Sequence, residues 1–147
     1  MRAALPGLEL HLVGEGLDRA IRDPHAGVVV HGHIPDLTPL LQGARVGIAP
    51  LRFGAGVKGK VNLGMSHGLP MVVTQCAAEG LHLLDGEHAL IADTSQALVS
   101  AVVTLCSDDV LWNRISRASV ALTQQHFTAD AARAAVLASL PPSEPTA

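Results

Sequence analysis

The seven residues from 54 to 60, GAGVKGK, are the segment of this sequence whose composition and spacing best suit ligand chemistry. Three glycines in six positions let the backbone approach a ligand closely and aim several N–H groups at it. A helix is expected directly afterwards, so its N-terminus adds partial positive charge to the full charges of Lys58 and Lys60. These features predict a site for a phosphate or diphosphate group. The alternative is a solvent-exposed loop that needs glycine only for its turns.

Two known phosphate-binding motifs match this stretch incompletely. Gly54, Gly59 and Lys60 match the Walker A pattern G-x-x-x-x-G-K-[ST]. Its last position, which should carry the magnesium-binding hydroxyl, is occupied by Val61. The dinucleotide pattern G-x-G-x-x-G is formally present over 54–59, yet the next strand ends in Thr74-Gln75 instead of an acidic residue that would bind a ribose. Neither an NTPase nor a dinucleotide-binding enzyme is therefore the favoured interpretation.

Short apolar runs bounded by glycine, proline or polar residues predict five strands, at 8–13, 28–30, 46–49, 71–74 and 89–92. Helices are expected between them. A brief polar helix should end near Asp23-Pro24, a second, capped by Pro35-Asp36, should run to Gly43, and a third of about two turns should end at Gly68. The segment 76–85 is expected to be a loop or short turn, and helical periodicity predicts three further helices, at 98–105, 111–122 and 129–140.

Strands that alternate with helices predict an α/β fold, a Rossmann-like parallel sheet with helices on both faces, followed by C-terminal helices. Such open sheets bind ligands beyond the carboxyl ends of their strands. The loops at 31–36, 50–60 and 74–80 follow three of the expected strands, so they should line one edge of the sheet. A binding site is expected at that edge.

Composition bounds the remaining classes of function. The chain has 147 residues, the size of one ordinary domain, with 48% apolar and 16% charged residues. A formal net charge of −3 gives no broad attraction for nucleic acid, so no nucleic-acid partner is expected. Cys76 and Cys106 lack CxxC spacing, which fits a reduced cytoplasmic compartment. No run approaches eighteen consecutive apolar residues, so no membrane span is expected.

The order of motifs resembles the group 1 glycosyltransferase family of the GT-B type. The resemblance extends from about Leu8 to Leu140 and is carried by LHLVGEG at 10–16, VVVHGHIPDLTPLLQGARVGIAPLRFGAGVKGKV at 28–61, MSHGLPMVVT at 65–74 and AAEGLHLLDGEHALIAD at 77–93. Members of this family have two Rossmann-like domains facing a cleft, and the C-terminal one binds the nucleotide-sugar donor. The resemblance implies that residues 1–140 form such a donor-binding domain, incomplete at its N-terminus, and that 141–147 form a disordered tail.

The resemblance also implies roles for individual residues. The positions that match the family's nucleobase-contacting segment are Gly32, His33 and Ile34. The positions that match or flank its diphosphate and sugar loop are Gly54, Ala55, Gly56, Val57, Lys58 and Lys60. Many relatives carry a glutamate pair spaced E-x7-E, and the matching positions here are Ala55 and Leu63, so a hydrogen bond from position 63 to a ribose is impossible.

Three further residues are secondary candidates. Arg52 belongs to the same small basic group as Lys58 and Lys60, His67 precedes the Gly68-Leu69-Pro70 turn, and Glu79 follows the fourth expected strand. A structural histidine and a solvated carboxylate are the alternatives for the last two. His31 and His33 could face one side of a strand as metal ligands, but a third ligand is not evident and chance spacing explains the pair, so no metal site is expected.

The expected function is transfer of a sugar from a nucleotide-sugar donor to an acceptor, in cell-surface glycan or polysaccharide biosynthesis. No cofactor is expected besides the donor substrate, and no catalytic residue is assigned. Catalysis needs the donor diphosphate and an acceptor hydroxyl held together, so the isolated chain is expected to need a separate acceptor-binding domain or chain. The expected location is cytoplasmic, including the inner membrane face. The alternatives are a non-catalytic nucleotide-sugar-binding module or fragment, and a sugar-nucleotide epimerase.

Overall fold

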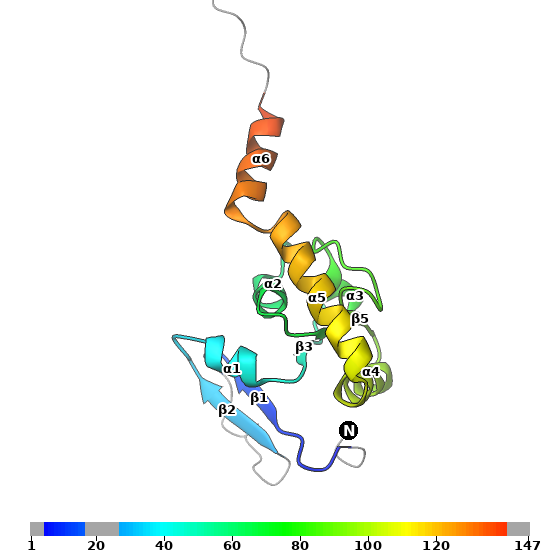
Figure 1. Ribbon diagram of the computed structural model, residues 1–147. Coiled ribbons are helices and arrows are strands. Elements are labelled where there is room, and N and C mark those ends of the chain that lie inside the picture. The colour runs from blue at the N-terminus through cyan, green and yellow to red at the C-terminus, as the bar shows by residue number, and fades with distance from the viewer. Residues whose placement is uncertain (1–4, 17–26, 141–147) are drawn as a thin grey trace, which may run out of the picture.

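The computed structural model describes residues 5–16 and 27–140, and Figure 1 shows their arrangement. Strand β1 (Leu10–Val13) pairs in parallel with β2 (Val28–Gly32), in a register that places Leu10 opposite Val28. The register shifts between Leu12 and Val13, which marks a bulge. Both predicted strands are therefore confirmed, with β1 beginning two residues later than expected. The polar helix expected to end near Asp23-Pro24 falls mainly on residues 17–26, outside the described residues.

The second sheet has the order β3-β4-β5, with all strands parallel. Its strands are Gly47–Ala49, Met71–Val73 and Leu90–Ile91, at the positions predicted from the apolar runs. Strand β4 is central and fully buried, because helices cover both faces of this sheet. Alternation of side chains along β4 sends Met71 and Val73 into one core cluster and Val72 into another.

The helices begin where capping residues predict them. Thr94, Asp108 and Thr128 each accept a hydrogen bond from the backbone N–H three residues later. The six helices of the described chain are α1 (Thr38–Gly43), α2 (Gly59–Ser66), α3 (Gln75–Ala78), α4 (Ser95–Ser107), α5 (Asp109–His126) and α6 (Ala129–Ser139). Helix α3 is one turn, within the segment expected to be a loop or short turn, and Thr74 caps it in the same way.

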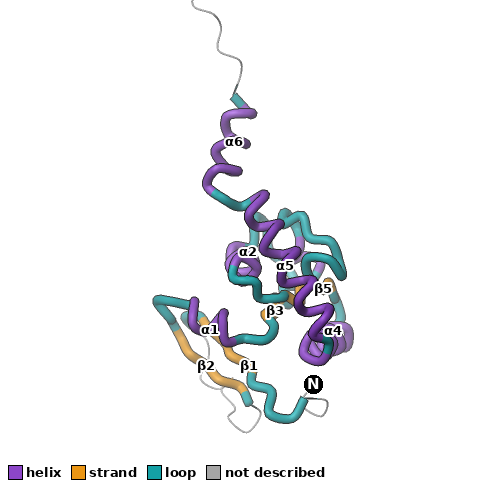
Figure 2. Tube along the Cα trace, viewed as in Figure 1, coloured by secondary structure: helices purple, strands orange, loops and turns teal. Residues whose placement is uncertain are grey.

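The parallel α/β architecture with helices on both faces is confirmed, but the strands form two sheets instead of one. In the described residues β1 and β2 make a two-stranded sheet, and no ladder joins it to β3. Helix α1 carries the chain from β2 to β3 and so from one sheet to the other, as Figure 2 shows. The alternation of strands and helices predicted the parallel direction correctly, but it does not specify which strands are neighbours.

Two clusters of buried side chains form the core, one on each face of the three-stranded sheet. The first includes Met65 of α2, Val73 of β4 and Leu81, and the second joins β4 to α4 and α5. Burial raises the pKa of the Cys106 thiol next to the second cluster, with Arg45 acting in the opposite direction. This thiol therefore stays protonated at neutral pH, which agrees with a packing role.

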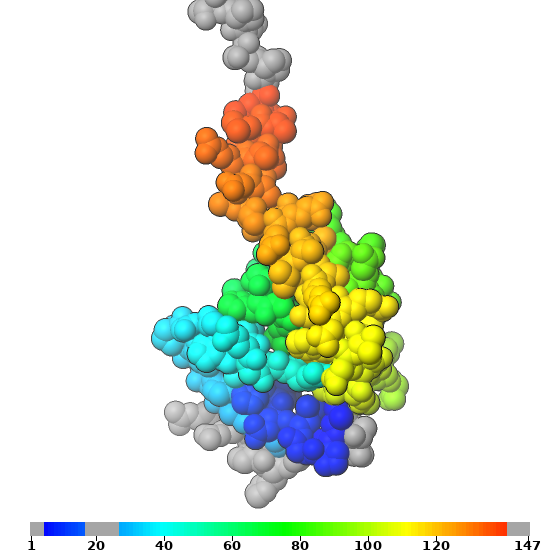
Figure 3. Space-filling view, in the orientation of Figure 1, coloured from blue at the N-terminus to red at the C-terminus, as the bar shows by residue number. Residues whose placement is uncertain are grey.

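Helix α6 projects from the rest of the fold, as the space-filling view in Figure 3 shows. It confirms the helix predicted at 129–140. None of its residues is buried, and Val136 and Leu137 of α6 and Leu140 just after it are each more than half exposed. The folded core therefore ends with α5.

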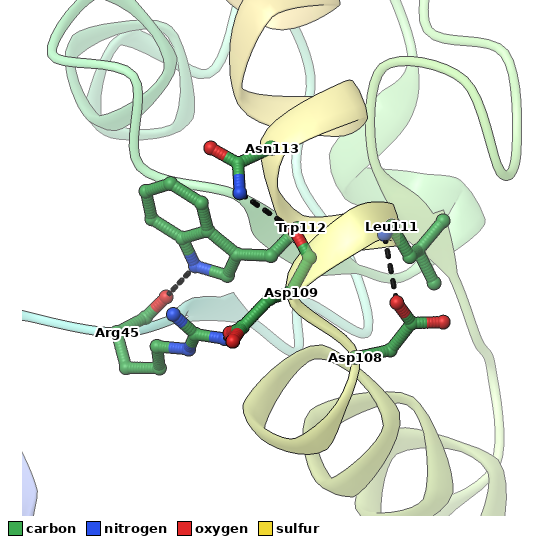
Figure 4. A network of polar contacts seen from close by, with 6 residues as sticks. All are labelled: Arg45, Asp108, Asp109, Leu111, Trp112 and Asn113. Carbon is green, nitrogen blue, oxygen red and sulfur yellow. Dashed lines mark hydrogen bonds and ion pairs between the residues drawn. The ribbon is translucent and has the colours of Figure 1, made fainter.

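A polar network joins the segment before β3 to the start of α5 (Figure 4). The indole N–H of Trp112 donates to the carbonyl oxygen of Arg45 at 2.7 Å. The Arg45 guanidinium lies 5.0 Å from the centre of the Trp112 ring and also forms an ion pair with Asp109. Trp112 is thus a packing residue, and it also fixes where β3 begins relative to α5.

Replacing Trp112 by phenylalanine is expected to lower the free energy of unfolding by about 1 kcal/mol, because the Arg45 carbonyl loses its donor while an aromatic ring remains. Urea denaturation followed by circular dichroism measures this. The matched control is Asn113→Ala on the next residue, whose side chain bonds only within α5, to the Asp109 carbonyl. Equal stability of Trp112→Phe and the parent chain would show that the bond contributes nothing.

Candidate functional site

The loop after β3 and the loop after β4 lie together, as expected for the carboxyl edge of a parallel sheet. The Thr74 hydroxyl at the end of β4 donates to the carbonyl oxygen of Leu51 at 2.6 Å. The Cys76 sulfur in α3 lies 3.9 Å from the carbonyl oxygen of Gly54. Two contacts from the β4 loop therefore support residues 51–54, although residues 51–57 themselves are exposed.

The backbone of this loop requires glycine at two positions. Gly54 has φ of 146° and Gly56 has φ of 78°, values that side-chain-bearing residues rarely adopt. A Cβ atom at Gly56 would meet nothing within 4 Å, so conformation and not crowding is the reason for glycine there. The open space beside Gly56 also leaves room for a ligand to approach the backbone.

The Lys58 side chain folds back onto the glycine-rich loop and binds two of its carbonyl oxygens. Its Nζ donates to the carbonyl oxygen of Gly56 at 2.7 Å and to that of Gly54 at 3.3 Å. Lys58 is also the residue that precedes α2, and its side chain makes no capping bond to the helix. A fixed ammonium group and the N-terminus of an eight-residue helix therefore lie at the same point, which is an arrangement that suits an anion.

The other predicted loop residues surround this point at the surface. Lys60 lies in the first turn of α2 and is exposed, as are Arg52 and Ala55. Val57 is 59% exposed, and its Cγ2 lies 4.0 Å from where a Cβ atom on Gly80 would be. Glu79 is the neighbour of Gly80 and ends α3, so the structure brings this carboxylate to the same edge as the glycine-rich loop.

The segment predicted to contact a nucleobase follows β2. Gly32 has φ of 72°, which turns the chain out of the strand. His33 is exposed and its Nδ1 lies 4.0 Å from a carboxylate oxygen of Glu15, so the ends of β1 and β2 meet here. Ile34 is half-buried. This segment belongs to the two-stranded sheet, whereas the glycine-rich loop belongs to the three-stranded one.

Asp36 bonds to the first residue of helix α1, whereas the N-cap residue is Leu37, one position after the predicted Pro35-Asp36 cap, and the Leu37 side chain makes no capping bond. The carboxylate oxygen of Asp36 accepts a hydrogen bond from the backbone N–H of Thr38 at 2.9 Å, and this bond is the main cause that lowers the Asp36 pKa below 3.8. His67, which ends α2, lowers it further. His67 therefore lies toward α1, at the opposite end of α2 from Lys58.

The depressed Asp36 pKa predicts how the start of α1 responds to acid. Because the folded-state pKa lies below the unfolded value, the bond between the Thr38 N–H and Asp36 contributes its full stabilisation above about pH 4 and is lost as pH falls through the folded pKa. Carboxyl-carbon NMR titration should place the Asp36 midpoint below 3.8, and Asp36→Asn should remove this titration. A midpoint at or above 3.8 would contradict a hydrogen bond from Thr38 to the Asp36 carboxylate.

The His31 side chain lies against another histidine. Its Nε2 lies 2.8 Å from Nδ1 of His11, and the two rings are stacked with centres 5.0 Å apart. The Nε2 of His11 lies 3.3 Å from a carboxylate oxygen of Glu9. Within residues 5–16 and 27–140, no group of three or more histidine, cysteine or acidic side chains is placed to hold a metal ion.

One polar residue near the glycine-rich loop, Asn62, was not predicted as a site residue from the sequence. Asn62 on α2 lines a shallow groove of about 360 Å³ between α2 and α5, together with Leu63 and Thr123. The Oδ1 atom of Asn62 is buried and has no hydrogen-bond partner in the described structure. The only feature of the sequence that could have pointed to Asn62 is its place in the helix that follows the glycine-rich loop. Thr74 and Cys76 were also missed, because their contacts to the loop join residues more than twenty positions apart.

The chain thus has a Rossmann-like α/β fold, with a glycine-rich loop, a lysine and a helix N-terminus at the carboxyl edge of its parallel sheet, where open sheets of this class place their ligand sites. The family model described as glycosyl transferases group 1 matches residues 1–108 of this chain. The chain therefore belongs to the group 1 glycosyl transferase family. No curated protein matches it.

Solved structures share the fold at low sequence identity. The C-terminal domain of a group 1 family glycosyl transferase (LpcC) from Francisella tularensis has 15% identity and a TM-score of 0.63, covering 70% of this chain and 55% of that one. Sucrose-phosphate synthase from Thermosynechococcus elongatus has 18% identity and a TM-score of 0.73, covering 92% and 40%. Anabaena HepE in complex with UDP-glucose has 21% identity and a TM-score of 0.68, covering 94% and 44%.

These values show a shared fold, and this chain spans between two fifths and just over half of those three solved chains. The Francisella structure is a C-terminal domain, which agrees with the part of the family that the motifs resemble. In the described residues, no helix is long and apolar enough to cross a membrane.

Proposed function

We propose that this chain is the donor-binding part of a nucleotide-sugar-dependent glycosyltransferase. The observation that carries the proposal is the Lys58 ammonium fixed over the glycine-rich loop at the N-terminus of α2, in a chain that belongs to a glycosyl transferase family. The diphosphate of the donor would lie against Gly54, Gly56 and Lys60. HepE, which shares this fold, is in complex with UDP-glucose, so a UDP-sugar is the first donor to test.

The proposed chemistry is the departure of a nucleoside diphosphate. The bond between the anomeric carbon of the sugar and the diphosphate oxygen breaks, the electron pair stays with the diphosphate, and the acceptor hydroxyl oxygen bonds to the carbon as it loses its proton. Lys58, Lys60 and the α2 N-terminus would stabilise the charge that builds up on the leaving group. The acceptor must come from a separate domain or chain, because a positioned hydroxyl is needed for this step.

The rest of the donor would extend along α2. Leu63, at the position where many relatives carry a ribose-binding glutamate, is 39% exposed, so the ribose would meet an apolar surface. Exposed loop residues Arg52 and Glu79 would lie beside the sugar and phosphates, while Gly32, His33 and Ile34 would lie beside the nucleobase. Cytoplasmic location and a role in cell-surface glycan or polysaccharide synthesis form part of the same proposal.

A non-catalytic nucleotide-sugar-binding module is the second candidate, and one observation favours it. Both positions of the E-x7-E pair lack a carboxylate, since Ala55 and Leu63 stand there. Such a module would bind the donor but would not transfer sugar when an acceptor domain is supplied. Sugar release from UDP-glucose in the presence of that domain therefore separates the two candidates.

Calorimetric titration with UDP, GDP, ADP and uridine tests the donor site. We expect saturable binding of one diphosphate, with UDP the first candidate, and binding of uridine weaker by at least about tenfold because it lacks the diphosphate. UMP is the intermediate control. Equal binding of UDP and uridine would contradict a diphosphate site, and no binding by any nucleotide would contradict the proposed function of this chain.

A further inference from the structure

The groove between α2 and α5 contains a polar group that the fold does not use. The two helices lie side by side (Figure 1), and Asn62 of α2 lines the groove between them. The Oδ1 atom of Asn62 is buried and has no hydrogen-bond partner in the described structure. A buried acceptor without a donor lowers stability, and an apolar side chain of similar size would avoid that loss. The stability of the fold therefore does not explain asparagine at this position, which is typical of residues at functional sites.

Three apolar side chains form part of the groove surface. Leu63 of α2 is 39% exposed, and Val120 of α5 and Phe127, just after α5, are half-buried. Phe127 packs against the first core cluster, so its ring is held in place. Binding sites for small molecules combine apolar and aromatic surface of this kind with a few polar groups. The groove therefore offers a fixed aromatic ring and aliphatic groups to the apolar face of a ligand.

Two hydroxyl groups in the groove can still accept hydrogen bonds. The Ser66 hydroxyl donates to the carbonyl oxygen of Leu63 at 2.8 Å, and the Thr123 hydroxyl donates to that of Val120 at 2.8 Å. Because each hydroxyl already uses its only hydrogen, each can act toward a ligand as an acceptor alone. Together with the Asn62 carbonyl, they suit a ligand that is rich in O–H donors.

The groove has no charge of its own. Among the residues that the structure describes, none that line it is a lysine, arginine, histidine, aspartate or glutamate. A charged ligand loses solvation on binding and needs a partner of opposite charge, so the groove favours an uncharged ligand. Its volume of about 360 Å³ falls within the range of about 300–1,000 Å³ for small-molecule sites. A saccharide matches all these properties, since it is uncharged, rich in hydroxyl groups and apolar on the C–H faces of its rings.

We propose that the groove between α2 and α5 binds an uncharged saccharide, at a site separate from that of the nucleotide donor. The Asn62 amide turns about its terminal torsion, which has a broad energy minimum, and accepts a hydrogen bond from a sugar hydroxyl. Further hydroxyls of the sugar donate to the Ser66 and Thr123 oxygens, and the C–H face of the ring lies on Phe127. The ligand thus provides the donor that the Asn62 carbonyl lacks in the fold alone.

The groove meets the proposed donor site at the start of α2. Gly59 is the first residue of α2, also lines the groove and directly follows Lys58. A glycan in the groove would therefore lie next to the donor diphosphate. The natural ligand is then a sugar unit of the acceptor glycan, whose reacting hydroxyl is positioned by the separate acceptor-binding part. This last step rests on the proposed function, whereas saccharide binding in the groove does not.

Amide chemical-shift mapping of the ¹⁵N-labelled full chain, without nucleotide, tests the site. The probes are methyl α-glucoside, methyl β-galactoside, maltose and cellobiose, each to about 50 mM, which detects dissociation constants in the millimolar range. We expect saturable shifts with at least one of them, largest at the Asn62 side-chain amide and at the Thr123 and Phe127 backbone amides. Gly54 and Gly56 should not shift. Glucuronic acid is the charged control and should bind at least about tenfold more weakly than the best of the four probes.

Substitution of Asn62 separates a binding role from a structural one. Asn62→Leu keeps most of the side-chain volume and removes the amide, so binding of the best probe should weaken by at least about tenfold. The urea midpoint of Asn62→Leu should be at or above that of the parent chain, because a buried acceptor without a partner is removed. The matched control is Asn113→Leu at an exposed position of α5, which should leave saccharide binding unchanged.

Several results would overturn the proposal. The absence of a saturable shift with any probe would exclude a saccharide site, as would equal binding by Asn62→Leu and the parent chain. A lower urea midpoint together with lost binding would show that Asn62 stabilises the fold and that the lost binding is secondary. Displacement of the bound saccharide by UDP would assign the groove to the nucleotide. Saccharide binding is measured without nucleotide, so its failure is distinguishable from a failure of the donor titration.

Discussion

Replacing Ile115 by alanine is expected to lower the free energy of unfolding by about 3 kcal/mol, within the range of about 2–5 kcal/mol for buried isoleucine truncation. Ile115 is fully buried and forms the second core cluster with Val72, Val102 and Leu105. This cluster is the contact through which α5 and α4 cover one face of β4. The missing side-chain atoms would leave a cavity between α5 and its neighbours in this cluster, which belong to two other elements, β4 and α4.

Urea denaturation with a fixed m-value measures this loss. The matched control is Val110→Ala on the same helix, where the side chain is 82% exposed, and the expected change is within about 0.5 kcal/mol. A loss below about 1 kcal/mol for Ile115→Ala would mean that the packing of α5 on the sheet is looser than the burial indicates.

The combined substitution Lys58→Ala and Lys60→Ala is expected to weaken binding of the preferred nucleoside diphosphate by about 10- to 100-fold. Two positive charges are removed from the proposed diphosphate site, and the Gly54 and Gly56 carbonyls lose the ammonium group that holds the loop. Calorimetric titration measures the dissociation constants. The effect should shrink at high salt, because both side chains are at or near the surface.

Two control variants distinguish the loss of positive charge at the site from other effects of the substitutions. Lys58→Arg keeps the charge and is expected to retain most of the affinity, whereas Arg133→Ala on the projecting helix α6 removes a remote charge and should have no effect. If the double variant binds as the parent chain does, the basic residues at the start of α2 are not part of the nucleotide site.

Much of the fold could be predicted from local signals. The strand at 71–73 is a run of apolar residues between Pro70 and Thr74, and the helices after Thr94, Asp108 and Thr128 begin at capping side chains. The split into two sheets could not be predicted in this way. Alternation of strands and helices specifies parallel pairing, whereas the neighbours of each strand depend on contacts between distant segments.

The same distinction applies to the candidate site. Glycines at 54 and 56 have positive φ, as a glycine-rich ligand loop suggests, and the loops after β3 and β4 meet as predicted. The bonds of the Lys58 ammonium to the loop carbonyls and the buried amide oxygen of Asn62 depend on side-chain conformation, for which the sequence holds no signal. His67 belongs to the same short helix as Lys60, yet it ends that helix and interacts with Asp36.

The central claim is that a nucleoside diphosphate binds where the glycine-rich loop meets the N-terminus of α2. Amide chemical-shift mapping of the ¹⁵N-labelled chain during titration with UDP tests it most directly. The account predicts that the largest shifts fall on Gly54, Gly56, Gly59 and Lys60. Largest shifts at Asn62 and Thr123, in the groove between α2 and α5, or no saturable shifts at all, would contradict it.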